Sequence, residues 1–275
     1  MSALDDVLTR IEQWPVENAA AAVISADGAV LASHGDLSQP YRLASVTKPL
    51  TAYAALIAVE EGVFTLEDPA GPEGSTVRHL LAHTSGLDFS EDKVRAAPGT
   101  RRIYSNRGFD VLADTLAARA EIPFATYLDE AVFAPLGMTD SRLDGSAGAG
   151  AVASVADLAR FAAELQHPTL LAAQTLTEAT TVAFPGLDGV LPGYGTQRPN
   201  DWGLGFELRD GKSPHWTGSG NSPATFGHFG QSGTFLWVDP QAGIACVAVA
   251  DRDFGPWAVE AWPPFSDAVL EALQD

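Results

Sequence analysis

The stretch Ser45-Val-Thr-Lys-Pro-Leu-Thr-Ala-Tyr-Ala-Ala-Leu-Ile-Ala-Val-Glu-Glu61 is the most apolar helix-like segment of the chain, and Gly62 ends it. Because proline is tolerated only in the first turn of a helix, Pro49 places the start near Ser45. Ser45 and Lys48 are spaced i and i+3, so a helix brings the hydroxyl and the amine onto one face. The free N–H groups of a helix start favour negative charge, and burial lowers the pKa of a lysine, so the serine would be activated. Taken alone, the pattern is better explained as a chance occurrence in which the serine only caps a helix.

Strand-like segments lie on both sides of this helix, toward the two ends of the chain. Asp27-Gly28, between the apolar runs 20–25 and 29–33, is a strong hairpin signal. Further strands are expected at 202–208, 225–228, 233–238 and 244–250. Helices are expected at 2–14, 45–61, 76–83, 108–120, 123–131, 155–165 and 257–273.

This order of elements predicts an α+β fold with an antiparallel β-sheet formed by both chain ends and flanked by terminal helices, plus an inserted, mainly helical region. We expect a single domain over residues 1–275. Its sheet region would cover about 1–44 and 191–275, and its helical region about 45–190.

The composition is that of a globular protein with an unusual charge. Of 275 residues, 46% are hydrophobic, and 35 acidic against 16 basic residues give a formal net charge of −19. Such a charge disfavours nucleic acid and anionic membranes as partners. The single cysteine, Cys246, lies in an apolar run and is expected in a buried strand. If Met1 is the true start, we expect no signal peptide and a cytoplasmic location; the oligomeric state stays open.

Two further segments carry side chains suited to catalysis. Tyr104-Ser-Asn106 follows a Pro-Gly turn and is predicted to lie in a loop. Lys48 and the arginines 101, 102 and 107 could there depress the pKa of Tyr104 for proton transfer. The alternative is an aromatic residue packed in a loop. Gly227-His-Phe-Gly-Gln-Ser-Gly233 lies at a predicted strand, where glycines allow a ligand to approach and His228 could bond to it. The alternative is a Gly-rich strand at a bend.

Taken together, the three segments resemble the S-x-x-K, Y-x-N and third motifs of the serine β-lactamase and penicillin-binding protein superfamily. The similarity is to the branch of class C β-lactamases, DD-peptidases and family VIII esterases. It extends over about residues 5–273 and includes four further segments: Thr76-Val-Arg-His-Leu-Leu-Ala-His-Thr-Ser-Gly-Leu87, Pro98–Asn106, Phe133-Ala-Pro-Leu-Gly-Met138 and Ser154–Phe161.

The resemblance implies a role for each motif residue. Ser45 would be the acylated nucleophile, and Lys48 and Tyr104 would share the general-base and general-acid work, in an order that the coupled pair leaves open. Asn106 would orient Lys48 and a substrate carbonyl. His228 would replace the lysine of the third motif, with Phe229, Gly230 and Gln231 beside the substrate. The backbone N–H groups of Ser45 and Gln231 would form the oxyanion hole.

Other sites are less well supported by the sequence. His79 and His83 have the i, i+4 spacing of a zinc pair, but lack a third ligand, so a structural role is favoured. Gly205–Ser213 has one residue too many for a phosphate loop, and Lys212 is expected to be exposed in a turn. The chain contains no G-x-S-x-G elbow, which argues against an α/β-hydrolase. No metal and no cofactor are expected.

The third motif departs from the pattern of lactam-binding enzymes. Phe229 stands where a Thr or Ser hydroxyl helps to hold the substrate carboxylate, and the lysine of that motif is absent. The net charge of −19 also offers little long-range attraction to anionic antibiotics. We therefore expect a carboxylesterase or small amide hydrolase, with an ester, amide or lactam as the class of small-molecule substrate. The alternatives are a β-lactamase or D-amino-acid peptidase with the same site, and a non-catalytic penicillin-binding or sensor module.

Overall fold

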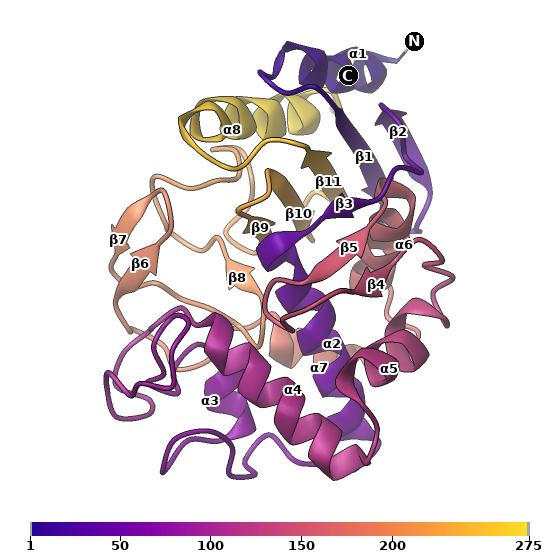
Figure 1. The fold of residues 1–275 in the computed structure, drawn as a ribbon. Helices are drawn as coiled ribbons and strands as arrows, with labels where there is room; N and C mark the ends of the chain where they lie inside the picture. Colours follow the sequence, from indigo (N-terminus) through magenta and orange to yellow (C-terminus); the bar gives the residue numbers. More distant parts are fainter. Residues whose placement is uncertain (1, 274–275) are drawn as a thin grey trace.

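A six-stranded sheet built from both ends of the chain forms the centre of the protein in the computed structural model, which describes residues 2–273 (Figure 1). Its strands run in the order β2 (Val30–His34), β1 (Ala19–Ser25), β11 (Ile244–Ala250), β10 (Thr234–Asp239), β9 (Phe226–Gly230) and β8 (Glu207–Leu208). All neighbouring strands are antiparallel. The predicted α+β fold, with a sheet formed by both chain ends, is confirmed.

Helices cover both faces of this sheet (Figure 1). The terminal helices α1 (Ala3–Leu8) and α8 (Pro256–Glu271) pack on one face, and α2 (Thr47–Glu60) and α6 (Val155–Gln166) pack on the other. Strand side chains alternate between the two cores, as the period of a β-strand requires. In β1, Ala22 and Ile24 belong to the core around α2 and α6, whereas Ala21 and Val23 belong to the core around α1 and α8. Cys246 is buried in this second core, as predicted.

The remaining elements are short and lie mainly in the middle of the chain. The helices are α3 (Val77–Leu81), α4 (Asn106–Ala120), α5 (Phe124–Leu128) and α7 (Ala173–Ala179), with 3-10 turns at Thr9–Gln13 and Ala44–Val46 and a π-helical turn at Asp129–Phe133. The strands β3 (Tyr41–Arg42), β5 (Ala151–Ala153) and β4 (Arg142–Leu143) form one small sheet, and β6 (Gly189–Leu191) and β7 (Gly195–Gln197) form another.

The expected strand at 202–208 is mostly a tight turn. Gly203 N–H donates to the carbonyl oxygen of Phe206 at 2.9 Å, and Gly205 has a φ of +87°, a left-handed conformation that suits glycine. Only Glu207 and Leu208 join the sheet, opposite Gly227 and its neighbour in β9. The turn folds back because its glycines permit it, so an apolar run is not sufficient to make a strand here.

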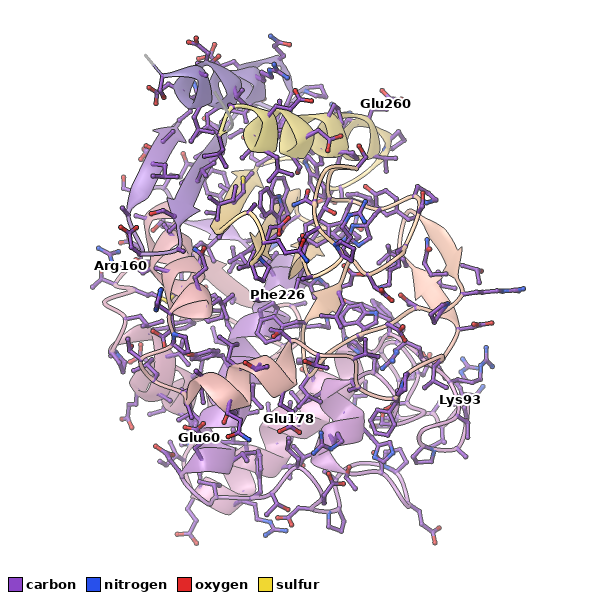
Figure 2. All side chains as sticks on the ribbon, turned by 180° about the vertical axis from the view of Figure 1, so that it is seen from behind. Glu60, Lys93, Arg160, Glu178, Phe226 and Glu260 are labelled. Carbon is purple, nitrogen blue, oxygen red and sulfur yellow. The ribbon has the colours of Figure 1, made fainter. Side chains whose placement is uncertain are left out.

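Many charged side chains lie on the outside of the molecule, although a few, such as Lys48 and Arg102, are buried. Seen from behind, the labelled residues Glu60, Lys93, Arg160 and Glu260 project from the periphery, whereas Phe226 lies inside and is only 4% exposed (Figure 2). Within residues 2–273, no helix combines the length and the apolar character that crossing a membrane requires.

Candidate active site

Ser45 is the middle residue of the 3-10 turn Ala44–Val46, and this turn directly precedes α2. Ala44 has a φ of +45°, a region that non-glycine residues rarely adopt. The hydroxyl groups of two residues that follow β9 in the sequence hold the backbone of the two residues that precede Ala44. Ser232 Oγ and Thr234 Oγ1 donate, at 2.6 and 2.8 Å, to the carbonyl oxygens two and one residues before Ala44. The central sheet therefore fixes the turn that presents Ser45.

Lys48 is fully buried in α2, and its amine nitrogen contacts three oxygen atoms. Nζ lies 2.5 Å from Asn106 Oδ1, 2.8 Å from the carbonyl oxygen of Gly148 and 3.3 Å from Ser45 Oγ. Burial lowers the pKa of Lys48 well below its ordinary value of 10.5, because the ammonium loses its hydration. A neutral amine has two N–H groups, which the two nearer acceptors engage, and one lone pair, which remains for the Ser45 hydroxyl.

Tyr104 lies among aromatic rings beside Lys48. Its ring centroid is 4.6 Å from that of His83, 5.7 Å from Trp202 and 5.8 Å from His228, and Lys48 Nζ is 4.5 Å from it. Burial raises the pKa of Tyr104 above its ordinary value of 10.0. The expectation of a depressed pKa is therefore wrong, and the phenol keeps its proton at neutral pH.

Two of the three arginines close to Tyr104 in the sequence bind other partners. Arg102 is buried and donates to four backbone carbonyl oxygens, at 2.6 to 3.0 Å. Arg107 donates to Asp92 at 2.5 Å, and Arg101 is exposed. The expected loop also ends earlier than predicted, because α4 begins at residue 106.

His228 and Phe229 point to opposite faces of β9. His228 Nε2 lies 3.3 Å from Tyr104 Oη, and His228 Nδ1 lies 2.6 Å from the carbonyl oxygen of Phe229. Because a carbonyl oxygen only accepts, Nδ1 carries the ring proton, and Nε2 accepts from the Tyr104 hydroxyl. Burial lowers the pKa of His228 to about 3, so the imidazole is neutral. The ring of Phe229 is 6% exposed and packs in the second core, 4.9 Å from Phe254 between centroids.

A cavity of about 220 Å³ opens in front of the nucleophile. Six of the residues selected from the sequence border it: Ser45, Tyr104, Asn106, His228, Phe229 and Gln231. Gly230 is not among the residues that border the cavity. A Cβ atom at this position would collide with the carbonyl oxygen of Leu43 and approach Thr234 Oγ1 to 2.5 Å. The glycine thus lets β9 approach the turn that carries Ser45.

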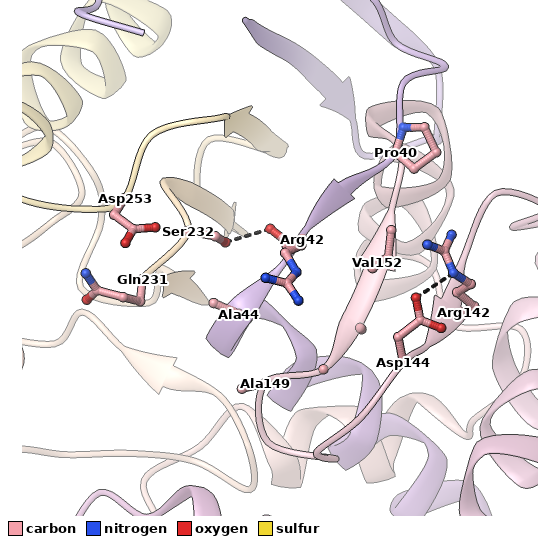
Figure 3. A pocket seen from close by; sticks show the side chains of 12 residues that line it. Pro40, Arg42, Ala44, Arg142, Asp144, Ala149, Val152, Gln231, Ser232 and Asp253 are labelled. Atoms are coloured by element: carbon pink, nitrogen blue, oxygen red, sulfur yellow. Dashed lines mark hydrogen bonds and ion pairs between the residues drawn. The ribbon is translucent and has the colours of Figure 1, made fainter. Parts of the chain in front are cut away.

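A larger groove of about 780 Å³ adjoins this cavity along β3 and β5 (Figure 3). Ala44 and Gln231 border both spaces. In the groove, Arg142 pairs with Asp144 at 2.7 Å, whereas the exposed Arg42 has no ion-pair partner within residues 2–273. The groove therefore offers an unpaired guanidinium beside the turn of the nucleophile.

Sequence reasoning missed residues that join the site from distant segments. Gly148, in the Gly-rich run 145–150, supplies a carbonyl oxygen that accepts from Lys48. Trp202 borders the cavity and contacts Tyr104. Lys212, expected to be exposed, is 4% exposed and pairs with Glu207. Lys212 is buried because its ammonium group pairs with the buried carboxylate of Glu207.

The predicted structural role of His79 and His83 agrees with their contacts. His79 Nδ1 lies 2.9 Å from Thr76 Oγ1 at the start of α3, and His83 Nδ1 accepts from the backbone N–H of Ser105 at 3.1 Å. In the part of the chain that the structure describes, no group of three or more His, Cys, Asp or Glu side chains could hold a metal ion.

The motifs and the fold of this chain match those of a known protein family. The family model described as Beta-lactamase matches residues 10–270. The chain belongs to the Beta-lactamase family. A solved structure described as a beta-lactamase (Mb2281c) from Mycobacterium bovis is 61% identical, with a TM-score of 0.96 over 97% of this chain and 99% of that chain. The resemblance inferred from the motifs is confirmed.

Two curated relatives match over shorter stretches. The D-alanyl-D-alanine-carboxypeptidase/endopeptidase AmpH of Escherichia coli (strain K12) is 30% identical over 142 residues, 38% of this chain and 37% of AmpH. Esterase EstB of Burkholderia gladioli is 33% identical over 147 residues, 36% of this chain and 37% of EstB. The matched stretches thus span little more than a third of these relatives, whose names describe hydrolases of different substrates. The chain is thus a Beta-lactamase-family member whose relatives include proteins named for different hydrolytic activities.

Proposed function

We propose that the protein is a serine hydrolase that forms an acyl-enzyme on Ser45 and acts on carboxylic esters or small amides. The observation that carries this proposal is the environment of Lys48. Its buried amine lies 3.3 Å from Ser45 Oγ, and two other oxygen atoms engage its N–H groups. A neutral amine held in this way can accept the serine proton.

In the proposed reaction, Ser45 Oγ bonds to the substrate carbonyl carbon while its proton passes to Lys48. The bond to the leaving group then breaks, Tyr104 gives that group its proton, and Lys48 returns a proton to Tyr104. Water next attacks the acyl carbon, giving one proton to Lys48, which passes it to Ser45 Oγ as the acid is released. The N–H groups of Ser45 and Gln231 would stabilise the oxyanion, and Asn106 would hold Lys48.

The lining of the cavity supports a neutral substrate. Among the described residues that border it there is no Lys or Arg, and His228 is uncharged because burial lowers its pKa to about 3. Glu207 borders the cavity too, but it is only 1% exposed and is paired with Lys212. A substrate carboxylate would thus find no cation inside this cavity, whereas an ester needs none.

The test is hydrolysis of short-chain p-nitrophenyl esters by the wild type and by Ser45→Ala. We expect the variant to lose at least roughly 10³-fold in kcat, because the acylation step disappears. Ser33→Ala, on the exposed edge strand β2, is the matched control and should keep full activity. Full ester hydrolysis by Ser45→Ala would overturn the proposal. Absence of any Ser45 adduct with a fluorophosphonate, detected by mass spectrometry, would instead indicate a non-catalytic binding module.

A second candidate function is that of a β-lactamase or D-amino-acid peptidase with the same nucleophile. The unpaired Arg42 in the adjoining groove favours it, because a guanidinium there could receive a substrate carboxylate. The descriptions of Mb2281c and AmpH point in the same direction. Nitrocefin hydrolysis as efficient as ester hydrolysis, and sensitive to Arg42→Met, would favour this candidate over the esterase.

A further inference from the structure

Three ionisable side chains are buried together beside the cavity, which one of them, Glu207, borders, and the proposed reaction does not use them. Glu207, Lys212 and His215 are 1, 4 and 6% exposed. One carboxylate oxygen of Glu207 pairs with Lys212, and the other accepts from His215 Nε2 and Trp216 Nε1, each at 2.9 Å. Burial alone would raise the pKa of Glu207, but His215 and Lys212 lower it to about 2, so the carboxylate is ionised. Burying charges is unfavourable even when they are paired, so the cluster requires an explanation.

Lys212 connects the two ends of the turn between residues 201 and 208. Its ammonium group donates to the carbonyl oxygen of Asp201 at 2.7 Å and to that of Leu208 at 2.6 Å, as well as to Glu207. The three N–H groups are then all engaged. The ion pair therefore closes the turn that begins at Trp202.

Trp202 links this turn to the site. Its ring centroid is 5.7 Å from that of Tyr104 and 5.4 Å from that of His228. Trp202 Nε1 has no hydrogen-bond partner among the described residues, so the position of the ring depends on its backbone and on packing. Glu207 itself stands opposite Gly227 in the β8–β9 pairing, one residue before His228. The ion pair is therefore connected to the hydrogen bond between Tyr104 and His228 both through Trp202 and through the pairing of β8 with β9.

We propose that the buried ion pair of Lys212 and Glu207 is a positioning device, which holds Trp202 and β8 against Tyr104 and His228 and so keeps the Tyr104 hydroxyl aligned with the reacting group. Neither member of the pair exchanges a proton with substrate in this role. The inference rests on the proposed function, because the aligned hydroxyl is the proposed proton donor.

The test compares the kinetics of two variants, each normalised by the fraction of Ser45 that reacts with a fluorophosphonate. Lys212→Met keeps the side-chain length and removes all three N–H donors. We divide kcat by the fraction of Ser45 that a fluorophosphonate labels, and we expect this value to fall about tenfold or more while KM stays within about twofold. The reason is that a misplacement of ~1 Å slows the chemical step by at least roughly this factor. The double variant Lys212→Met/Glu207→Gln leaves no unpaired charge in this cluster. It should recover thermal stability relative to the single variant without recovering kcat.

The matched control is Lys93→Met, which removes an exposed lysine at the periphery of the molecule (Figure 2). Its kcat should stay within about twofold of the wild type, as is usual for surface substitutions. If kcat per labelled site is unchanged in both Lys212 variants, the ion pair serves stability alone and the inference is wrong. If Ser45 of the wild type is not labelled at all, the proposed function fails instead.

Discussion

At the scale of single residues, the proposed chemistry depends on the protonation state of Lys48. Burial lowers its pKa well below 10.5, and two acceptors engage its N–H groups without contributing a negative charge. The neutral amine exists above the lowered pKa and is lost as the pH falls through it. We therefore predict that kcat/KM for a neutral ester is maximal above the pKa of Lys48 and declines on its acidic side. His228, with a pKa of about 3, adds no second decline near neutral pH.

The measurement is a pH–rate profile of kcat/KM for a p-nitrophenyl ester, compared with Lys48→Arg. A guanidinium cannot lose its proton in this range, so the variant should be inactive at every pH, by at least roughly 10³-fold. A decline centred near 10.5, or substantial activity in Lys48→Arg, would contradict the assignment of Lys48 as the base.

At the scale of secondary-structure elements, the approach of β9 to the Ala44–Val46 turn defines the site. Gly230 makes this approach possible, because any Cβ atom there would collide with the carbonyl oxygen of Leu43. We predict that Gly230→Ala separates the strand from the turn, lowers kcat/KM by about 10–100-fold and costs about 1–3 kcal/mol of stability. Kinetics and urea unfolding measure the two effects. Gly211→Ala, at an exposed glycine with nothing within 4 Å of an added Cβ, is the matched control. Equal effects at both glycines would contradict this account.

At the scale of the whole molecule, the net charge of −19 acts on substrates before they reach the cavity. Screening shortens the Debye length from about 30 Å at 0.01 M salt to about 8 Å at 0.15 M. We predict that kcat/KM for an anionic substrate such as nitrocefin rises several-fold over this range, while kcat/KM for a neutral ester stays constant, as roughly expected for long-range repulsion. Parallel salt titrations with the two substrates provide the test. The same salt dependence for both would show that the global charge does not select between them.

The sequence alone determined the features that act over a few residues. The shared face of Ser45 and Lys48 and the hairpin at Asp27-Gly28 follow from local periodicity and turn chemistry, and the order of strand-like and helix-like segments indicated the α+β fold. Contacts across the chain decided the rest. The acceptor of Lys48 on Gly148 lies 100 residues away, and the partner of Tyr104 on His228 lies 124 residues away. A pKa and a burial depend on such neighbours, which is why the raised pKa of Tyr104 and the inward position of Lys212 could be known only from the tertiary structure.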